Sequence, residues 1–356
     1  MSCGGARGMR AFARVLSAAA ILEFGPGRAL VSSAQIVTEF DVPTPRSTPA
    51  DITAGPDGNV WFTEASGNKI GRITMSGVIT EYAVPTFFSY PVGIAAGPDG
   101  AIWFIESNAN KVGRLTVAGA FSEFPIPTPS SSPFAIAAGP DGNLWFTENN
   151  GHKIGKITTS GTITEFLVPG AYPLAIAPGP DGNVWFTDLP EKIGRITTGG
   201  AFVEFPTPTS SSFPYGIVAG PRGNVWVAEA AVALIGRSTT AGVIHELGVA
   251  PAGSAVSITT GPDGNLWFTD TGTNAIGRMT PGGAVTTFAI PTPGSIPYRI
   301  TAGPDGALWF VEGAGNKIGR VSVAGAVVVP TLSRRMLALF AAAIGAAALL
   351  LVRKRV

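Results

Sequence analysis

Charged side chains are scarce in this chain. Asp, Glu, Lys and Arg make up 13% of its 356 residues, whereas an average soluble domain carries about 25%. The formal net charge is only +1, so the chain has no strong electrostatic field that would attract a polyanion. We therefore expect no nucleic-acid partner.

Cysteine and histidine are almost missing. The only cysteine, Cys3, precedes every segment expected to fold, which excludes disulfide bonds and cysteine-bound metals. The two histidines are His152 and His245, and no phosphate-binding loop, paired-histidine motif or nucleophile elbow is present. The repeated Asp-Gly-Asn turns supply one carboxylate each, whereas Ca²⁺ takes about six to eight oxygen ligands. We therefore expect no metal site.

Glycine and proline, by contrast, are abundant and periodic. The chain has 47 Gly and 30 Pro, and many of them belong to copies of one stretch, Gly-Pro-Asp-Gly-Asn-Val-Trp-Phe-Thr-Glu at 55–64. The stretch recurs about every 40 residues, and such a period is typical of a repeat architecture. All seven Trp residues lie in its copies. The copies begin at Gly55, Gly97, Gly139, Gly179, Gly220, Gly261 and Gly303.

Each repeat is expected to form four short strands. In the first copy they would lie at 49–54, 59–64, 69–74 and 78–84, joined by turns rich in Gly, Pro, Asp and Asn. Gly71 is expected where an aromatic ring or a neighbouring backbone packs closely. Seven such units predict an all-β fold, a seven-bladed β-propeller of four-stranded blades. A solenoid is the alternative, but it would need polar capping repeats that the sequence lacks.

The phase of the repeat indicates how the ring closes. A lone outer-strand segment at 36–42 precedes the first full copy, and the last copy ends without its own Glu-aromatic pair. We therefore expect the propeller to span 35–329, with strand 36–42 completing the last blade. This pairing would cover a strand edge that is otherwise open to other chains.

The N-terminal segment has the features of a secretory signal. In residues 1–34, Arg7, Arg10 and Arg14 precede a short apolar run at 15–22, and small residues stand at 32–34, which is typical of a cleaved signal peptide. A disordered leader is the alternative, and translation could instead start at Met9.

The C-terminal segment, 330–356, is expected to anchor the chain. Met336–Val352 contains 17 residues without a charge, and 353–355 are basic. As a helix this run would be about 25 Å long, which is short but sufficient for a bilayer. We expect a transmembrane helix whose basic end stays cytoplasmic, so that the propeller is exported and extracytoplasmic. A buried core helix is the alternative.

The repeat resembles one known family. Its elements Gly-Pro-Asp-Gly-Asn-x-Trp-Phe-Thr-Glu, Asn-Lys-Ile-Gly-Arg-Ile-Thr and Ile-Thr-Glu-Phe, over roughly 36–325, are similar to those of the streptogramin (virginiamycin B) lyase family. The resemblance implies a seven-bladed propeller. In members that are enzymes it implies a magnesium-assisted elimination, which opens a cyclic depsipeptide antibiotic at an ester linkage.

A second resemblance concerns the C-terminal end. Residues 329–355, beginning Val-Pro-Thr-Leu-Ser, resemble the IPTL-type sorting signals that are thought to be processed by an exosortase-type enzyme. Arg334 and Arg335 depart from that pattern, so cleavage of the segment is left open.

The catalytic histidines that the family resemblance implies have no counterpart here. In the family they stand at x in Pro-x-(Gly/Ala)-Ile, at the start of innermost strands, and none of the seven x residues is His in this chain. Because His is the usual general base near neutral pH, we predict no catalytic residue of this kind and leave enzyme activity open. His152 is expected in a turn and His245 on an outer strand. The x residues are Ala50, Val92, Phe134, Leu174, Tyr215, Val256 and Tyr298.

An acid follows each Trp-containing strand. Because it occurs in every copy, we interpret it as a turn or strand-pairing element rather than as an active site. The seven acids are Glu64, Glu106, Glu148, Asp188, Glu229, Asp270 and Glu312.

The loops that lead into the innermost strands differ most between copies and are rich in Pro, Ser and aromatic residues. Such loops suit contact with a small molecule, a glycan or another protein, although they could also simply seal the blades. After x, most copies have Gly, Ala or Ser, but the first has Asp51 and the last has Arg299. Ring closure makes these blades neighbours, so we predict an Asp51–Arg299 pair. The candidate ligand-binding residues are Phe134, Tyr172, Tyr215, Tyr298, Arg299 and Asp51.

The fifth copy is the least regular. Arg222 replaces the turn Asp, which we interpret as an exposed change on a hairpin. The apolar stretch 230–234 replaces a polar turn and is a candidate contact surface.

Together these features favour an exported, membrane-tethered, monomeric propeller that binds a ligand or protein, without a cofactor. The alternative is a carbon–oxygen lyase that uses Mg²⁺ to linearise a cyclic depsipeptide or a related substrate.

Overall fold

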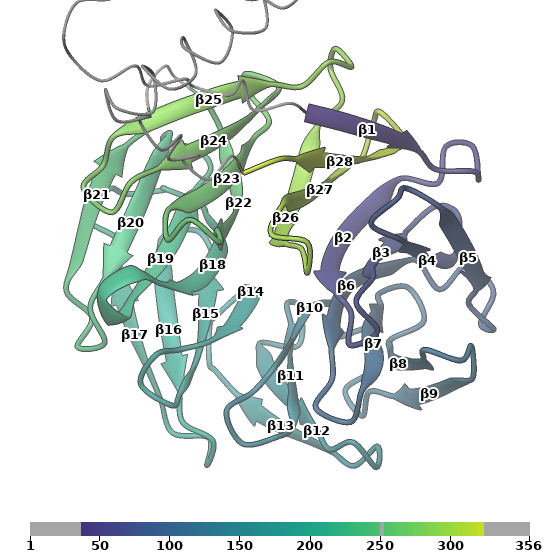
Figure 1. The fold of residues 1–356 in the computed structure, drawn as a ribbon. Coiled ribbons are helices and arrows are strands. Elements are labelled where there is room, and N and C mark those ends of the chain that lie inside the picture. Colours follow the sequence, from purple (N-terminus) through teal and green to yellow (C-terminus); the bar gives the residue numbers. More distant parts are fainter. Residues whose placement is uncertain (1–36, 250–252, 324–356) are drawn as a thin grey trace, which may run out of the picture. The chain divides into compact units, whose positions relative to one another are not determined.

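Seven four-stranded antiparallel sheets surround a central axis in the computed structural model of the chain (Figure 1). The structure describes residues 37–249 and 253–323. The predicted all-β, seven-bladed propeller is thereby confirmed. The predicted leader at 1–34 and the predicted segment at 330–356 lie outside the described residues. Within the described ranges, no helix is long and apolar enough to cross a membrane.

Blades 1 to 6 run outward from the axis in chain order, and in blade 7 the first strand of the chain takes the outermost place. Blade 1 consists of β2 (Pro49–Ala54), β3 (Val60–Glu64), β4 (Lys69–Ile73) and β5 (Ile79–Ala83). These strands lie where the repeat predicts them, and their ends differ from the predicted ones by a residue or less. The innermost strands of neighbouring blades contact one another around the whole ring.

The remaining blades repeat this order. Blades 2 to 4 consist of β6 (Pro91–Ala96), β7 (Ala101–Glu106), β8 (Lys111–Thr116) and β9 (Phe121–Pro125); β10 (Pro133–Ala138), β11 (Leu144–Glu148), β12 (Lys153–Ile157) and β13 (Ile163–Leu167); and β14 (Pro173–Pro178), β15 (Val184–Asp188), β16 (Lys192–Ile196) and β17 (Phe202–Pro206). Blades 5 to 7 consist of β18 (Pro214–Gly220), the 3₁₀ turn η1 (Pro221–Gly223), β19 (Asn224–Glu229), β20 (Leu234–Ser238) and β21 (Ile244–Gly248); β22 (Ala255–Thr260), β23 (Leu266–Asp270), β24 (Ala275–Met279) and β25 (Val285–Ala289); and β26 (Pro297–Ala302), β27 (Leu308–Glu312) and β28 (Lys317–Val321) with β1.

The apolar core lies between blades. All five residues of β3 are buried, and Val60 and Phe62 pack with Ile73 against Trp309 of blade 7. The Phe62 ring crosses the neighbouring strand at Gly71, where an added Cβ would lie 2.1 Å from the ring. The sequence prediction of a close aromatic approach at this glycine is therefore confirmed, and a larger residue there would displace the ring.

The turn aspartate of the repeat binds the tryptophan. In blade 1, Trp61 Nε1 donates to Asp57 Oδ1 at 3.0 Å, and the backbone N–H of Asn59 donates to the same oxygen at 3.2 Å. A buried indole N–H needs such an acceptor, so the two motif residues are chemically linked. The equivalent pairs are Trp103–Asp99, Trp145–Asp141, Trp185–Asp181, Trp267–Asp263 and Trp309–Asp305.

Strand β1 (Val37–Asp41) forms the outer strand of blade 7 by pairing with β28, the position that the phase of the repeat predicts. Its Phe40 stacks on Trp309, with ring centroids 5.7 Å apart. Its Glu39 accepts hydrogen bonds from the backbone N–H and the hydroxyl of Thr292, both at 2.8 Å, which ties blade 7 to the loop that follows blade 6. The two ends of the propeller are thus joined in one blade.

Candidate functional site

A β-bulge at the start of each innermost strand determines where the x side chain lies. The pairing register of each innermost strand shifts just after its first residue. In blade 1, Ala50 and Asp51 therefore leave the ladder. The Thr63 hydroxyl accepts the Asp51 N–H at 3.0 Å and donates to the Val92 carbonyl at 2.7 Å, so it supports the bulge and links blades 1 and 2. Bulges of this kind re-aim side chains, here out of the strand ladder.

Arg299 lies among three aromatic rings near the axis. Its Cζ atom is 5.7 Å from the ring centroid of Phe134 and 5.6 Å from those of Tyr215 and Tyr298. These distances fall within the range of about 6 Å for a cation–π contact. The rings come from blades 3, 5 and 7, so ring closure is required to assemble this cage.

The aromatic rings also contact one another. Phe134 and Tyr215 meet edge to face with centroids 6.4 Å apart, and Tyr215 and Tyr298 do so at 5.7 Å, with their hydroxyl groups in contact. Burial raises the pKa of Tyr215, whereas Arg299 opposes that rise. Tyr215 therefore remains a neutral phenol at physiological pH.

Asp51 is fixed by backbone amides. Its two carboxylate oxygens accept hydrogen bonds from the N–H of Ile52 at 2.8 Å and from the N–H of Ile94 in blade 2 at 3.1 Å. Burial raises the pKa of this carboxyl above its usual value, while the positive charge of Arg299 and the two amides act in the opposite direction. The acid thus stabilises the contact between β2 and β6 and also faces Arg299.

The predicted direct pair between Asp51 and Arg299 does not form. Among the ion pairs of the described residues, none within 4.0 Å joins these two side chains. The physical reason is that each is already held elsewhere, Asp51 by two amides and Arg299 by three rings. The two charges are electrostatic neighbours, but they are held apart.

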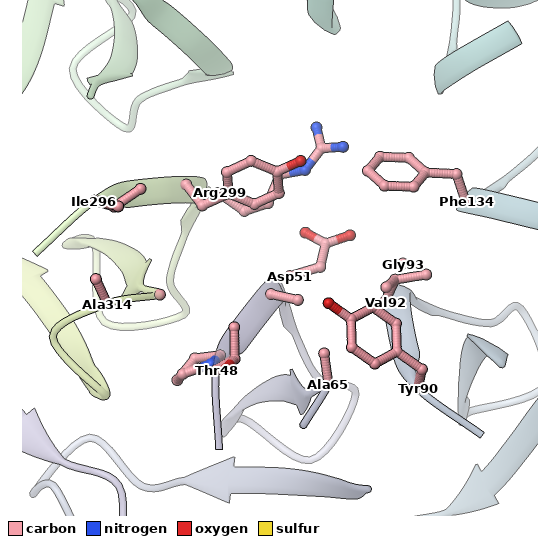
Figure 2. A pocket seen from close by; sticks show the side chains of 14 residues that line it. Thr48, Asp51, Ala65, Tyr90, Val92, Gly93, Phe134, Ile296, Arg299 and Ala314 are labelled. Atoms are coloured by element: carbon pink, nitrogen blue, oxygen red, sulfur yellow. The ribbon is translucent and has the colours of Figure 1, made fainter. Parts of the chain in front are cut away.

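A pocket of about 440 Å³ opens beside these two charges. Its walls come from blades 7, 1 and 2, and Phe134 of blade 3 bounds it on the far side. Figure 2 shows the Asp51 carboxylate directed toward the Arg299 guanidinium, with Phe134 next to that guanidinium and with Tyr90 and Val92 on the same side as Phe134. Of the described residues that line the pocket, Asp51 and Arg299 are the only charged ones. The volume lies within the range of about 300–1,000 Å³ that is typical of small-molecule sites.

Five of the six candidate ligand-binding residues thus come together. Asp51, Phe134, Tyr298 and Arg299 line the pocket, and Tyr215 supports Arg299 from the side. Tyr172 does not join them. It is 46% exposed on the loop of blade 4 and meets the His152 ring edge to face at 4.8 Å. Phe134 and Tyr215 come from the two blades beside blade 4, but they occupy the x position, whereas Tyr172 precedes Pro173 and the x residue of blade 4 is Leu174.

The pocket also contains residues that the sequence analysis did not select. Tyr90 and Ile296 stand at its rim, each with a positive φ, and are 40% and 50% exposed. Thr48 occupies the same place in blade 1. All three directly precede the Pro that begins an innermost strand, but this position alone could not have identified them, because Tyr172 shares it and lies outside the pocket.

Neither histidine belongs to the pocket. His152 lies in a turn with a φ of 52°, and its Nδ1 is 2.6 Å from the Ala171 carbonyl oxygen. His245 is on the outer strand β21, opposite Arg237. Both positions agree with the sequence interpretation and leave the pocket without an imidazole base.

The repeated acids at the ends of the second strands are buried and structural. Glu64 is fully buried, and neither of its carboxylate oxygens has a hydrogen-bond partner among the described residues. Burial, and then the negative charge of Glu81, raises the pKa of Glu64 to about 7. Glu81 itself lies 2.6 Å from Lys69. The same rise to about 7 is found at Glu106, Glu148, Glu229 and Glu312.

The pocket does not suit Mg²⁺. Among the described residues, no group of three His, Cys, Asp or Glu side chains is placed to hold a metal ion. The only carboxylate that lines the pocket, Asp51, has both oxygens engaged by amides and faces a guanidinium. A divalent cation would meet a like charge there rather than the oxygen ligands that it requires.

Fold and pocket together define a seven-bladed β-propeller with a mostly apolar pocket near its axis. The family model described as the virginiamycin B lyase family matches residues 27–172, 98–246 and 168–350. The chain belongs to this family, as its repeat motifs indicate.

Solved structures of relatives share the whole fold. A streptogramin B lyase is 40% identical, with a TM-score of 0.78 over 82% of this chain and 98% of its own. A catalytically inactive histidine-to-alanine variant of virginiamycin B lyase from Staphylococcus aureus, solved with quinupristin, is 37% identical, with the same TM-score over 82% and 100%. Virginiamycin B lyase of Bacillus licheniformis is 51% identical over 41 residues, a stretch that spans 14% of that protein.

Proposed function

We propose that this chain is an exported, membrane-tethered propeller that binds a small molecule in the axial pocket and does not act as a lyase. The observation that carries the proposal is the chemistry of the pocket. Its walls are mostly apolar and aromatic, and its only carboxylate is already engaged by amides. Concave apolar sites with a few oriented polar groups are typical of ligand binding.

The missing base supports binding over catalysis. An elimination needs a group that removes a proton from the substrate, and neither histidine of this chain lies at the pocket. One relative is described as catalytically inactive once a single histidine becomes alanine. Here all seven x positions carry residues other than histidine.

The second candidate function is a magnesium-assisted carbon–oxygen lyase, which the 40% identity to a streptogramin B lyase favours. The test is to incubate the purified propeller with a streptogramin B antibiotic and Mg²⁺ and to follow linearisation by mass spectrometry, with the S. aureus enzyme as positive control. We expect no linear product above the level without protein. Linear product formed at a rate proportional to protein concentration would overturn the proposal.

Binding in the pocket is tested directly with a pocket-filling variant. Saturation-transfer NMR of a fragment set containing neutral, anionic, cationic and zwitterionic aromatic compounds should give hits with the wild-type propeller. Ala50→Trp places an indole into the pocket, so these hits should disappear while the melting temperature stays within a few degrees. An absence of hits, or hits that survive in the Ala50→Trp variant, would contradict binding at this place.

The proposed tether rests on the sequence of both ends. Expression of the full chain in a bacterium, followed by fractionation, should recover it with the membrane, whereas a chain that ends at 329 should be released to the extracytoplasmic fluid. Recovery of both forms in the same soluble fraction would remove the tether from the proposal.

A further inference from the structure

Two opposite charges are held apart in the pocket by their own supports. Asp51 is fixed by two backbone amides, and Arg299 by three aromatic rings from three blades. Neither side chain depends on the other for its position. Such rigid support keeps the donor and the acceptor in place before anything binds, which lowers the entropy cost of binding.

The surroundings offer few other partners for the two charges. The other lining residues are apolar or aromatic, apart from Thr48. In such surroundings a charge is stable only when an oppositely charged or hydrogen-bonding group satisfies it. Asp51 and Arg299 are both only half-buried, so a group that enters the pocket can reach them. A bound group that lies between the two side chains can pair with both, because each carboxylate oxygen of Asp51 accepts one amide and keeps a further acceptor site.

The chemistry of that group follows from what each side chain offers. Arg299 has only donors and prefers a planar anion such as a carboxylate, whereas Asp51, when ionised, has only acceptors and prefers an ammonium group. The ligand must carry both groups at one end, a few ångströms apart. Its remaining part must be apolar, because Tyr90 and Val92 line one side of the pocket and Ile296 lines the other.

We propose that the pocket binds a free α-amino acid with an apolar side chain, whose carboxylate meets Arg299 and whose ammonium group meets Asp51. This inference rests on the proposed function, since it names the ligand class of the same pocket. The charges of Asp51 and Arg299 cancel, and an α-amino acid with an apolar side chain also carries no net charge. The side chain of the ligand would lie between Tyr90 and Ile296, which line opposite sides of the pocket (Figure 2).

A matched set of four probes tests the charges one at a time. L-Phenylalanine carries both charged groups, 3-phenylpropionate lacks the ammonium group, 2-phenylethylamine lacks the carboxylate, and phenylacetamide is a neutral compound with a donor and an acceptor. We expect isothermal titration calorimetry to give the tightest binding for L-phenylalanine. Loss of either charged group should weaken binding about tenfold or more, which is the typical effect of a charged hydrogen bond.

Variants assign each charged group of the ligand to its partner. Arg299→Met keeps a long apolar side chain among the rings and removes the guanidinium. It should abolish the preference for L-phenylalanine over 2-phenylethylamine and leave 2-phenylethylamine binding within about threefold. Asp51→Asn should instead abolish the preference for L-phenylalanine over 3-phenylpropionate. A purely structural effect would weaken all four probes equally.

The outcomes separate this inference from the proposed function. Equal binding of all four probes, or tightest binding of phenylacetamide, would overturn the amino-acid assignment even in variants that fold normally. If other fragments bind in a manner sensitive to Ala50→Trp while L-phenylalanine does not, the assignment fails but the binding function stands. The comparison of probes on the wild-type chain does not depend on the stability of any variant.

Discussion

One substitution in blade 5 leaves a buried tryptophan without its usual acceptor. Arg222 occupies the place of the turn aspartate and has a φ of 64°. As a result, the Nε1 of Trp226 is buried without a hydrogen-bond partner among the described residues. The sequence analysis interpreted Arg222 as an exposed change on a hairpin. The structure places it on the hairpin but adds that the change removes an acceptor from the core.

Restoring the aspartate should stabilise the propeller. Arg222→Asp would supply an oxygen to Trp226 and a partner to Arg237, as Asp57 does for Trp61 and Arg72. Because an unsatisfied buried donor costs about 1–3 kcal/mol, we expect a gain of about 1–2 kcal/mol in the free energy of unfolding. Urea denaturation followed by tryptophan fluorescence measures it.

Arg222→Ala is the matched control for this substitution, since it removes the arginine without supplying an acceptor. The free energy of unfolding of Arg222→Asp should therefore exceed that of Arg222→Ala by most of the predicted gain. Equal stabilities would mean that the indole N–H is satisfied by water.

Some details of the pocket could not be derived from single positions in the sequence. The pattern break at Asp51 and Arg299 marked the right place, because ring closure brings the first and last blades together. That they do not pair directly depends on Ile94 and on Phe134, which belong to other blades. Tyr172 looked equivalent to other loop aromatics, but it precedes the Pro of its strand and is exposed instead of following that Pro toward the axis. The surroundings of Asp51, Arg299 and Tyr172 depend on residues of other blades, which the sequence of a single repeat does not contain.

At the scale of elements, the repeat predicted the positions of the strands closely. The turn residues and the alternation of polar and apolar positions fix where each strand of blade 1 begins and ends. The bulge at the start of each innermost strand was not predicted, because it depends on hydroxyls such as that of Thr63, which bind the neighbouring blade. It is this bulge that turns the variable side chains out of the ladder.

Strand β1 is expected to be essential for the ring. A chain that begins at residue 43 lacks β1, so the edge of β28 is exposed and Thr292 loses its carboxylate partner. We expect a melting temperature lower by about 5 °C or more, together with self-association through the open edge. Differential scanning calorimetry and light scattering measure these two effects.

A chain that begins at residue 35 retains β1 and is the control for this deletion. Its melting temperature should lie close to that of the chain that also contains residues 1–34, and it should stay monomeric. Indistinguishable behaviour of the two truncated chains would show that β1 contributes little.

At the scale of the whole molecule, the buried acids make stability depend on pH. For five of them, Glu64 included, burial raises the pKa from 4.5 to about 7. Between these values the folded chain binds more protons than the unfolded chain, so the free energy of unfolding falls as pH rises. Glu81 acts in the opposite sense: hydrogen bonds from Lys69 and Thr44 outweigh its burial and lower its pKa, and its contribution is lost in acid.

The propeller should therefore be most stable in mildly acidic solution. We expect a melting temperature at pH 5.5 that exceeds the value at pH 8.5 by about 5 °C or more, and a second decline below about pH 4. Glu64→Gln should reduce the difference between pH 5.5 and pH 8.5, because it removes one of the groups that must ionise. Asp41→Asn, at a side chain that is 88% exposed, is the control and should leave the difference unchanged. A stability that rises steadily from pH 5.5 to pH 8.5 would contradict this account.

The closure of blade 7 has a consequence for the order in which the chain folds. Glu39 and its partner Lys317 are 278 positions apart, so the first strand to be synthesised is the last to find its neighbours. Contacts this distant in sequence form slowly, because the chain between them must be ordered first. A nascent or truncated chain that lacks the seventh blade keeps a free strand, and a chaperone or protease can therefore distinguish incomplete copies from finished ones.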